Sequence, residues 1–378
     1  MPKRILIFLL LLTACSHNHV PNDAAVVKIG AANPLTGSFA HLGKDNVNGI
    51  KLALNEANGK PVFLSGKPVY FKLVNEDDQG NSKTAILVAQ KLVEEGVVGV
   101  IGDLTSGASI SASKIYAKAG VPQISPSATA EGFTHQGYAT TFRVIANDRQ
   151  QGMALGNYAV HVLHAKRIAI IDDRTTYGQG LADQVEKTVM AQGGRIVDRE
   201  YTTDQSADFM ATLSAIQAKA PDLVFFGGMD TQAAPMKRQM DELGIKAQFL
   251  CGDGCRTGDF IRLAGSDSDG VIASSPGLPL SRMPGGEKFK KSFEEKYGKI
   301  QQYAPYAYDA TNVLINAMVR AGSSDPSKYL PMLRTTDWKG VTGRIRFNAE
   351  GDVLNGPVTF YKVVHGAWKP ENPTGRVR

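Results

Sequence analysis

Residues 83–102 read KTAILVAQKLVEEGVVGVIG, a helix-length stretch followed at once by a short apolar run. Apolar residues in 83–95 recur at helical spacing, which predicts an amphipathic helix. Residues 97–102 are apolar and rich in valine, as expected for a strand that is buried on both faces of a parallel sheet. A helix that leads into such a strand is part of a βαβ unit, so this stretch indicates an α/β fold.

The same alternation extends in both directions along the chain. Strand-like runs occupy 26–30, 69–74 and 121–124, and a second series occupies 167–172, 195–197, 222–228 and 248–250. Two series predict two open sheets, and 378 residues give room for two domains. Ligands of open α/β sheets bind beyond the carboxyl ends of the strands. The candidate site loops therefore follow Gly30, Gly102, Ile124, Ile171, Phe226 and Leu250.

Composition and motifs argue against several classes of function. The chain is 43% hydrophobic and 21% charged, which is ordinary for globular domains. Its formal net charge is +6, and removal of Lys3 and Arg4 with a leader segment lowers it to +4. The basic residues are scattered among acidic ones, so no nucleic-acid partner is expected. Walker and Gly-x-Ser-x-Gly motifs are missing, and the sequence after Gly178 lacks the third glycine of a dinucleotide site, so we expect neither a cofactor nor enzyme activity.

The first fifteen residues predict export. Lys3 and Arg4 precede the apolar run 5–12, which leads into Thr13-Ala14-Cys15. This order is typical of a secretory signal peptide, and the run is short for a membrane span. Residues 12–15 also resemble the bacterial lipobox, which implies cleavage before Cys15, lipid on its sulfur and a tether over 16–25. By the same resemblance, Ser16 favours the outer membrane of a Gram-negative envelope. The alternative is a plain signal peptide with an incidental cysteine.

The two remaining cysteines enclose an acidic residue, in Cys251-Gly252-Asp253-Gly254-Cys255. An exported compartment permits disulfides, and two glycines let so short a loop bend. A Cys251–Cys255 disulfide and a pair of free thiols therefore both remain open. A metal site is a third alternative, but two thiols without a nearby histidine make an incomplete ligand set, and no metal is expected.

Five motifs in order resemble the leucine-isoleucine-valine-binding proteins of bacterial transporters. They are 30–37 (GAANPLTG), 102–107 (GDLTSG), 125–129 (SPSAT), 177–180 (YGQG) and 252–254 (GDG). Their order and spacing, over 27–368, carry the resemblance. It implies a type I periplasmic binding protein, an α/β protein with two Rossmann-like lobes of parallel sheet joined by a three-strand hinge. The chain then crosses between the lobes three times, so lobe 1 is expected to comprise 26–146 with 277–352, and lobe 2 to comprise 147–276 with 353–378.

The resemblance assigns residues to the carboxylate of a bound amino acid. It implies that the hydroxyls of Ser106 and Thr129 contact this carboxylate and that the backbone carbonyl of Ser127 contacts the ammonium group. Ser106 also suits the role chemically, because it precedes a helix expected over 109–119 and helix N-termini attract anions. The alternative is that Ser106 and Thr129 merely cap helices.

The ammonium group of such a ligand needs an anion, since a buried unpaired charge is costly. Asp253 matches the acidic position of the family, where glutamate is usual, so the shorter side chain implies a closer backbone or an intervening water. The alternative is that Asp253 only forms an Asp-Gly turn. Tyr177 matches an aromatic residue that closes over the ligand from the second lobe, and is otherwise an exposed turn residue.

Two positions depart from the family and concern specificity. Leu42 and Met229 stand where aromatic residues are common, so the side-chain pocket is expected to stay apolar but to change shape. Tyr303 is expected to supply part of the pocket surface that the two absent aromatic residues would have formed. The alternative is that Tyr303 simply packs, as do Tyr306 and Tyr308.

The expected function is that of a monomeric, lipid-anchored periplasmic protein that closes around a free aliphatic or branched-chain amino acid and delivers it to an ABC permease and its ATPases. The alternative is a sensing or regulatory protein for an amide, urea or another small polar molecule, because the fold serves both roles. A hydrolase is disfavoured. Of the seven histidines only His41 stands near a candidate site loop, and we interpret it as a pocket-rim or solvated residue.

Overall fold

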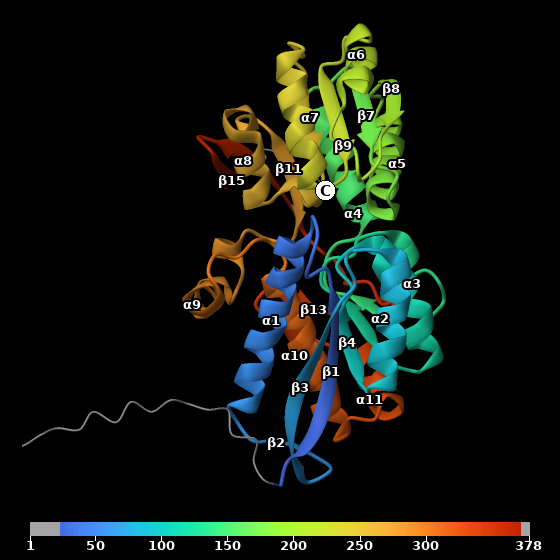
Figure 1. Ribbon diagram of the computed structural model, residues 1–378, viewed down its shortest axis with the longest axis vertical. Coiled ribbons are helices and arrows are strands. Elements are labelled where there is room, and N and C mark those ends of the chain that lie inside the picture. Colours follow the sequence, from blue (N-terminus) through green and yellow to red (C-terminus); the bar gives the residue numbers. More distant parts are fainter. Residues whose placement is uncertain (1–22, 372–378) are drawn as a thin grey trace, which may run out of the picture.

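The computed structural model describes residues 23–371, which form two α/β lobes stacked along the long axis of the molecule (Figure 1). The predicted signal peptide, Cys15 and most of the predicted tether lie outside these residues, as do 372–378. Strand β1 (Ala25–Asn33) begins where the tether was expected to end. The predicted α/β class with two lobes is confirmed.

In the described part of the chain, lobe 1 contains a six-stranded sheet in the order β2-β3-β1-β4-β5-β6. Neighbouring strands are parallel except at the edge, where β2 runs antiparallel to β3. The other strands are β2 (Val62–Leu64), β3 (Lys67–Asp77), β4 (Gly99–Gly102), β5 (Gln123–Ser125) and β6 (Thr141–Arg143). Each of the runs predicted at 26–30, 69–74, 97–102 and 121–124 contains one of these strands, although β4 and β5 begin two residues later than the runs.

Helices cover both faces of this sheet, because alternate strand residues point to opposite sides and both sides are apolar. Ala31 belongs to the core on the side of α1 and α10, whereas Ala32 belongs to the core on the side of α2 and α3. The helices of lobe 1 are α1 (Ala40–Asn58), α2 (Ser82–Glu94), α3 (Ser106–Lys118), α9 (Gly286–Tyr297), α10 (Ala304–Ala321) and α11 (Pro326–Arg334). A small pair of strands, β12 (Trp338–Lys339) and β13 (Arg344–Ile345), completes the lobe.

Lobe 2 contains, within the described residues, a seven-stranded sheet in the order β15-β14-β11-β10-β9-β7-β8. Its parallel part comprises β7 (Ile168–Asp172), β8 (Ile196–Tyr201), β9 (Leu223–Gly227), β10 (Gln248–Cys251) and β11 (Ile272–Pro276). At one end of the sheet, β14 (Val358–Val364) runs antiparallel to β11, and the edge strand β15 (Ala367–Pro370) runs antiparallel to β14. The βαβ pattern alone predicts a purely parallel sheet, whereas the observed sheet is mixed.

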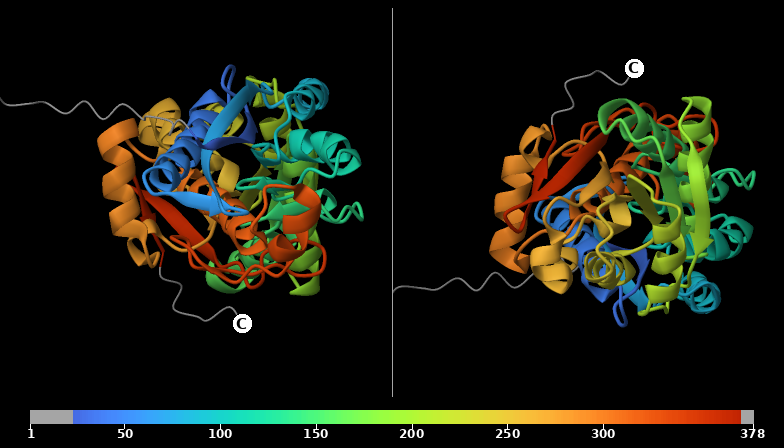
Figure 2. Two further views of the ribbon diagram at one scale, coloured as in Figure 1. Left: turned by 90° about the horizontal axis from the view of Figure 1, so that it is seen from below. Right: turned by 90° about the horizontal axis from the view of Figure 1, so that it is seen from above.

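The helices of lobe 2 also lie on both faces of their sheet, as the view from above shows (Figure 2, right). They are α4 (Asp148–Asn157), α5 (Thr176–Ala191), α6 (Met210–Ala218), α7 (Asp230–Glu242) and α8 (Gly258–Ala264). Among residues 23–371, no helix combines the length and the apolar character that crossing a bilayer requires.

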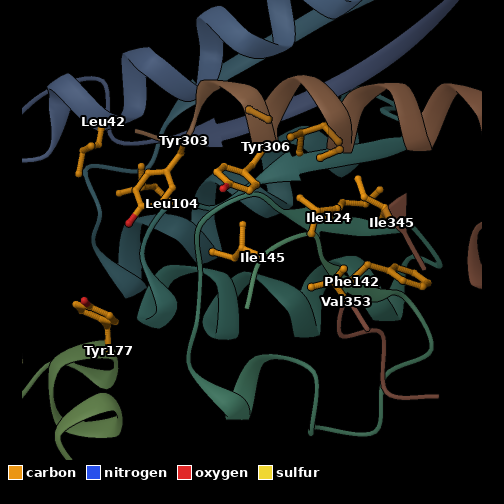
Figure 3. Close-up of a cluster of buried hydrophobic side chains, with 14 of the residues drawn as sticks. Leu42, Leu104, Ile124, Phe142, Ile145, Tyr177, Tyr303, Tyr306, Ile345 and Val353 are labelled. Atoms are coloured by element: carbon orange, nitrogen blue, oxygen red, sulfur yellow. The ribbon is translucent and has the colours of Figure 1, made fainter. Parts of the chain in front are cut away.

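Within 23–371 the chain passes between the lobes near 144–147, 276–279 and 353–357. Apolar side chains of lobe 1 extend to these segments: Phe142 and Ile145 lie with Ile345 and Val353 in one buried cluster (Figure 3). We propose that the lobes divide at 146/147, 276/277 and 352/353, since strands on either side of these points pair with different sheets.

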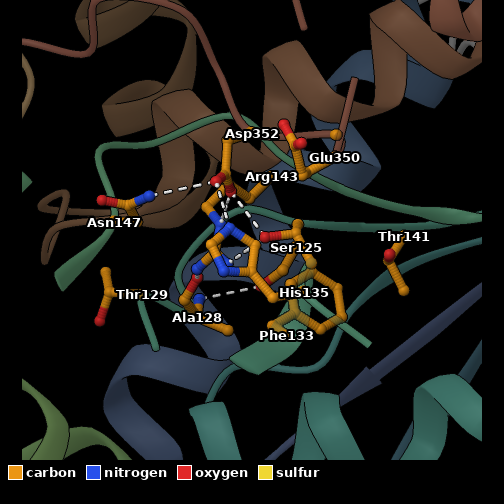
Figure 4. Close-up of polar contacts among 12 residues, drawn as sticks. Ser125, Ala128, Thr129, Phe133, His135, Thr141, Arg143, Asn147, Glu350 and Asp352 are labelled. Atoms are coloured by element: carbon orange, nitrogen blue, oxygen red, sulfur yellow. Dashed lines mark hydrogen bonds and ion pairs between the residues drawn. The ribbon is translucent and has the colours of Figure 1, made fainter. Parts of the chain in front are cut away.

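A buried ion pair ties the first crossing to the third (Figure 4). The Arg143 side chain is fully buried, and its Nε donates to the Asp352 carboxylate. Its other nitrogens donate to the carbonyls of Ala128 (2.8 Å) and Ala130 (2.9 Å) and to Thr134 Oγ1 (2.9 Å). Asn147, which caps α4, donates from Nδ2 to the second Asp352 oxygen at 3.1 Å. These bonds compensate the cost of burying the charges and fix the crossing segments to one another.

Candidate functional site

A cavity of about 570 Å³ lies between the lobes, at the carboxyl ends of strands from both sheets. Six of the eight predicted ligand residues border it: Ser106, Ser127, Tyr177, Met229, Asp253 and Tyr303. Strand-end loops converge here because the strands of each parallel region point the same way. A larger hollow, of about 840 Å³, lies beside the crossing segments around Asn147 and Asp352, and none of the predicted ligand residues borders it.

One wall of the cavity is the N-terminus of α3. The helix begins at Ser106, three residues before the predicted start, and Thr105 caps it by accepting a bond from the Ala108 N–H. The Ser106 hydroxyl accepts from the N–H groups of Thr129 and Ala130, at 3.2 Å each. Since a hydroxyl has two acceptor sites and one proton, that proton remains available to an acceptor in the cavity. The unpaired N–H groups of the first turn add further donors for an anion.

Ser127 and Thr129 lie behind this helix end. The Ser127 hydroxyl donates to the Leu104 carbonyl at 3.0 Å, so its proton is used in a hydrogen bond within lobe 1. Thr129 is buried and does not border the cavity among the described residues. Its carbonyl accepts from the Asp148 N–H at 2.8 Å. Burial raises the pKa of Asp148 to about 8, against the opposing effect of the Thr129 hydroxyl. The structure therefore brings Ser106, rather than Thr129, to the cavity wall.

Opposite the helix end lies the Asp253 carboxylate. Tyr177, in the first turn of α5, donates from Oη to Asp253 Oδ1 at 2.9 Å, and Tyr303, just before α10, donates to Oδ2 at 2.6 Å. The two tyrosines come from different lobes and lie on opposite sides of the gap (Figure 3). Burial raises the pKa of Asp253, while the hydrogen bonds from Tyr303 and Tyr177 favour the ionised form. A carboxylate has about four acceptor sites, so Asp253 can also accept from a ligand cation.

The glycines beside Asp253 permit this close packing. A Cβ at Gly252 would lie 2.5 Å from the Tyr177 hydroxyl, and one at Gly254 would lie 2.6 Å from the Gly228 carbonyl. Larger residues would push the turn away from Tyr177, because real Cβ contacts are never this short. The Gly254 N–H also donates to Tyr177 Oη at 3.0 Å, which holds that hydroxyl in place for donation to Asp253.

Tyr303 is positioned by Asp45, which sequence reasoning missed. This buried residue of α1 accepts four backbone N–H bonds from residues 301–304, including one of 2.8 Å from Tyr303 itself. Burial raises the pKa of Asp45 and these N–H groups oppose that shift. An acidic residue inside an amphipathic helix is usually solvated, so nothing in the local sequence distinguished Asp45 from a surface residue.

The apolar part of the wall comes from Phe39, Leu104 and Met229. Leu42, which was predicted for this wall, is fully buried in the lobe 1 core and does not border the cavity. The start of α1 explains the difference. Phe39 is the last residue before the helix and faces the cavity, whereas Leu42 lies in the first turn on the side that packs against the lobe.

Cys251 and Cys255 are both buried, and the structure contains both as thiols. Burial raises the pKa of the Cys255 thiol, and its interaction with the Cys251 thiol adds to the effect. A Cys251–Cys255 disulfide therefore stays one of the two open alternatives, and the mass of the exported protein without reductant distinguishes it from a pair of thiols.

Comparisons with known proteins agree with this geometry. A model of the periplasmic binding protein family matches residues 26–367. The chain is 34% identical over 339 residues to Leu/Ile/Val-binding protein homolog 2 of Brucella abortus, a match that covers 89% of this chain and 90% of the relative. It is 31% identical over 340 residues to a leucine-, isoleucine-, valine-, threonine- and alanine-binding protein of Pseudomonas aeruginosa, with 90% of each chain covered.

Solved structures show the same architecture. A leucine-binding protein from Thermotoga maritima superposes with a TM-score of 0.86 at 29% identity, over 92% of this chain and 98% of the other. A branched-chain amino acid transporter substrate-binding protein from Streptococcus pneumoniae, in complex with isoleucine, gives 0.83 at 27% identity, over 91% and 98%. The resemblance found in the five motifs is thereby confirmed. The chain belongs to the periplasmic binding protein family, whose members bind solutes without catalysing a reaction.

Proposed function

We propose that this protein is the solute-binding component of an ABC transporter and captures a free aliphatic amino acid between its lobes. The observation that carries this proposal is the presence, in one cavity, of a buried carboxylate and a helix N-terminus. Asp253 pairs with the ammonium group, and the first turn of α3 with the Ser106 hydroxyl binds the carboxylate. An α-amino acid carries both charges and therefore uses both walls.

The side chain of the ligand is proposed to contact Phe39, Leu104 and Met229. These residues offer apolar surface and no charge, which favours aliphatic side chains such as those of leucine, isoleucine and valine. Relatives named for binding these amino acids and the isoleucine complex of a similar structure support this choice.

Tyr177 and Tyr303 reach Asp253 from different lobes, so a ligand beside Asp253 contacts a surface that exists only when the lobes are together. The ligand consequently favours the closed arrangement. We propose that the closed protein, as a monomer in the periplasm, docks on a permease and its ATPases.

A thermal-shift screen of refolded, ligand-stripped protein tests the ligand class, since a ligand that binds the native state raises the melting temperature. The common amino acids, their amides and urea form the panel. We expect the largest rises with leucine, isoleucine or valine. A rise with amides or urea alone would instead support the alternative of a sensor for small polar molecules, and would remove Asp253 from the role of ammonium partner.

Lipid anchoring is proposed at Cys15, and Cys15→Ser should abolish it. In cells fed radiolabelled palmitate, the wild-type chain should carry label and sediment with membranes, whereas the variant should be unlabelled and soluble, because a buried acyl chain contributes about 0.8 kcal/mol per methylene. Cys251→Ser is the matched control and should remain labelled. Wild-type protein without label would leave only the plain signal peptide, and a Cys15→Ser variant that is still labelled would remove Cys15 as the lipid site.

A further inference from the structure

His41 lies across the gap between the lobes, in the first turn of α1, whose N-terminal end faces lobe 2 (Figure 1). Its Nε2 is 2.9 Å from Asp230 Oδ2, and its Nδ1 is 3.8 Å from Asp259 Oδ2. Both carboxylates belong to lobe 2, at the starts of α7 and α8. The histidine side chain is 16% exposed and that of Asp230 is fully buried. A residue expected to be solvated is therefore part of the contact between the lobes.

We propose that His41 is an interlobe latch, which holds the two lobes closed when its imidazole is protonated. Nε2 lies within hydrogen-bond distance of Asp230 and Nδ1 lies at ion-pair distance from Asp259, so a protonated ring places its positive charge between two carboxylates, whereas the neutral ring has no charge. If the lobes separate about the crossing segments, His41 leaves both carboxylates. The latch exists only in the closed arrangement.

On the lobe 2 side of the latch, the surroundings of the Asp230 carboxylate favour a positively charged partner. Thr257 Oγ1 donates to Asp230 Oδ2 at 2.6 Å and so fixes the carboxylate that meets His41. The other Asp230 oxygen is buried and has no hydrogen-bond partner within residues 23–371. A buried carboxylate left with so few donors gains from a positive partner.

The other charged groups near His41 change the strength of its attraction to Asp230 but do not cancel it. Asp259 is one-third exposed and accepts from Arg262 Nε at 3.1 Å, so solvent and the arginine charge both weaken its electrostatic attraction to the histidine. On α1, Lys44 is exposed, and Asp45 is directed to the backbone of residues 301–304. Burial lowers the pKa of His41, but the hydrogen bond and charge of Asp230, with Asp259 and the Ser38 backbone, outweigh burial and raise it overall.

The sign of the pH effect follows from linkage. A histidine whose pKa is higher in the closed than in the open arrangement binds its proton more tightly when closed. Its contribution to closure is complete below the open-state pKa, near 6.5, and is lost as pH rises through the closed-state pKa. A ligand that requires closure should therefore bind more tightly at pH 6 than at pH 8.

The first test is the pKa of His41 itself, measured by NMR of protein labelled at histidine Cε1 and assigned by the signal missing in His41→Gln. It needs no ligand, so it is independent of the proposed function. We expect a value above the ordinary histidine pKa of about 6.5, and a fall in Asp230→Asn. Asp259→Asn, at a partly exposed site, serves if Asp230→Asn does not fold. An ordinary pKa that neither variant changes would overturn the latch.

The second test rests on the proposed function and uses the amino acid that gives the largest thermal shift. Between pH 6 and pH 8 its Kd for the wild type should rise by about 3- to 10-fold, between the effects of exposed and buried charge pairs. His161→Gln should show the same profile, and His41→Gln a flatter one. Asp253 titrates in all three proteins, so their difference isolates His41. Parallel profiles would contradict the latch, whereas a raised His41 pKa without amino-acid binding would overturn only the proposed function.

Discussion

Asp253→Asn is expected to weaken amino-acid binding by about 2–5 kcal/mol, roughly 30- to 5,000-fold in Kd. The asparagine keeps the size of the side chain, and its single oxygen can accept from one of Tyr177 and Tyr303 while its amide nitrogen faces the other, but it carries no charge for the ammonium group. The loss is large because the partner cation would then be buried without an anion. Isothermal titration with the tightest-binding amino acid measures it.

The stability of the same variant separates this effect from unfolding. Because burial raises the pKa of Asp253, the ionised carboxylate destabilises the ligand-free fold, and this cost grows as pH rises through the folded-state pKa. Ligand-free Asp253→Asn should therefore melt no lower than the wild type at neutral pH. The matched control is Asp204→Asn, at a half-buried residue that borders the same cavity, and its Kd should change little. If both variants lost the same amount of affinity, the loss would reflect the total negative charge of the cavity, and Asp253 would not be the specific partner of the ammonium group.

Asp352→Ala is expected to cost about 3–5 kcal/mol in the free energy of unfolding, because it leaves the fully buried Arg143 without its counter-ion. It also removes the acceptor of the Asn147 side chain at the start of α4. Urea denaturation followed by circular dichroism should show a much lower midpoint.

The control for this prediction is Asp337→Ala. Asp337 also pairs with an arginine, Arg344, but both side chains are about half exposed, so the midpoint should scarcely move. If Asp352→Ala were as stable as Asp337→Ala, the Arg143 cluster would not be what fixes the crossing segments.

The sequence was sufficient for the parallel parts of both sheets, because runs such as 97–102 and 168–171 are apolar throughout and bounded by helix-length stretches. It was not sufficient for β2, β14 and β15, which pair antiparallel with their neighbours at the ends of the two sheets. Strand β14 pairs with β11, more than eighty residues earlier in the chain, and local pattern says nothing about so distant a partner.

For the site, the motifs led to residues at strand ends, where fold geometry forces convergence, and six of eight border the cavity. Leu42 does not border the cavity, because the first turn of α1 decides which of Phe39 and Leu42 faces the gap, and that depends on the residue at which the helix begins. Asp45 and His41 act through partners that are far away in the sequence, at residues 301–304 and at Asp230. Their roles follow from tertiary contacts that no local spacing encodes.

The most direct test of the central claim is a crystal structure of the protein grown with the amino acid that gives the largest thermal shift. The account predicts the ligand between the lobes, with its ammonium group within hydrogen-bond distance of the Asp253 carboxylate and its carboxylate at Ser106 and the first turn of α3. A ligand bound elsewhere, or one in the cavity with its ammonium group away from Asp253, would contradict the account.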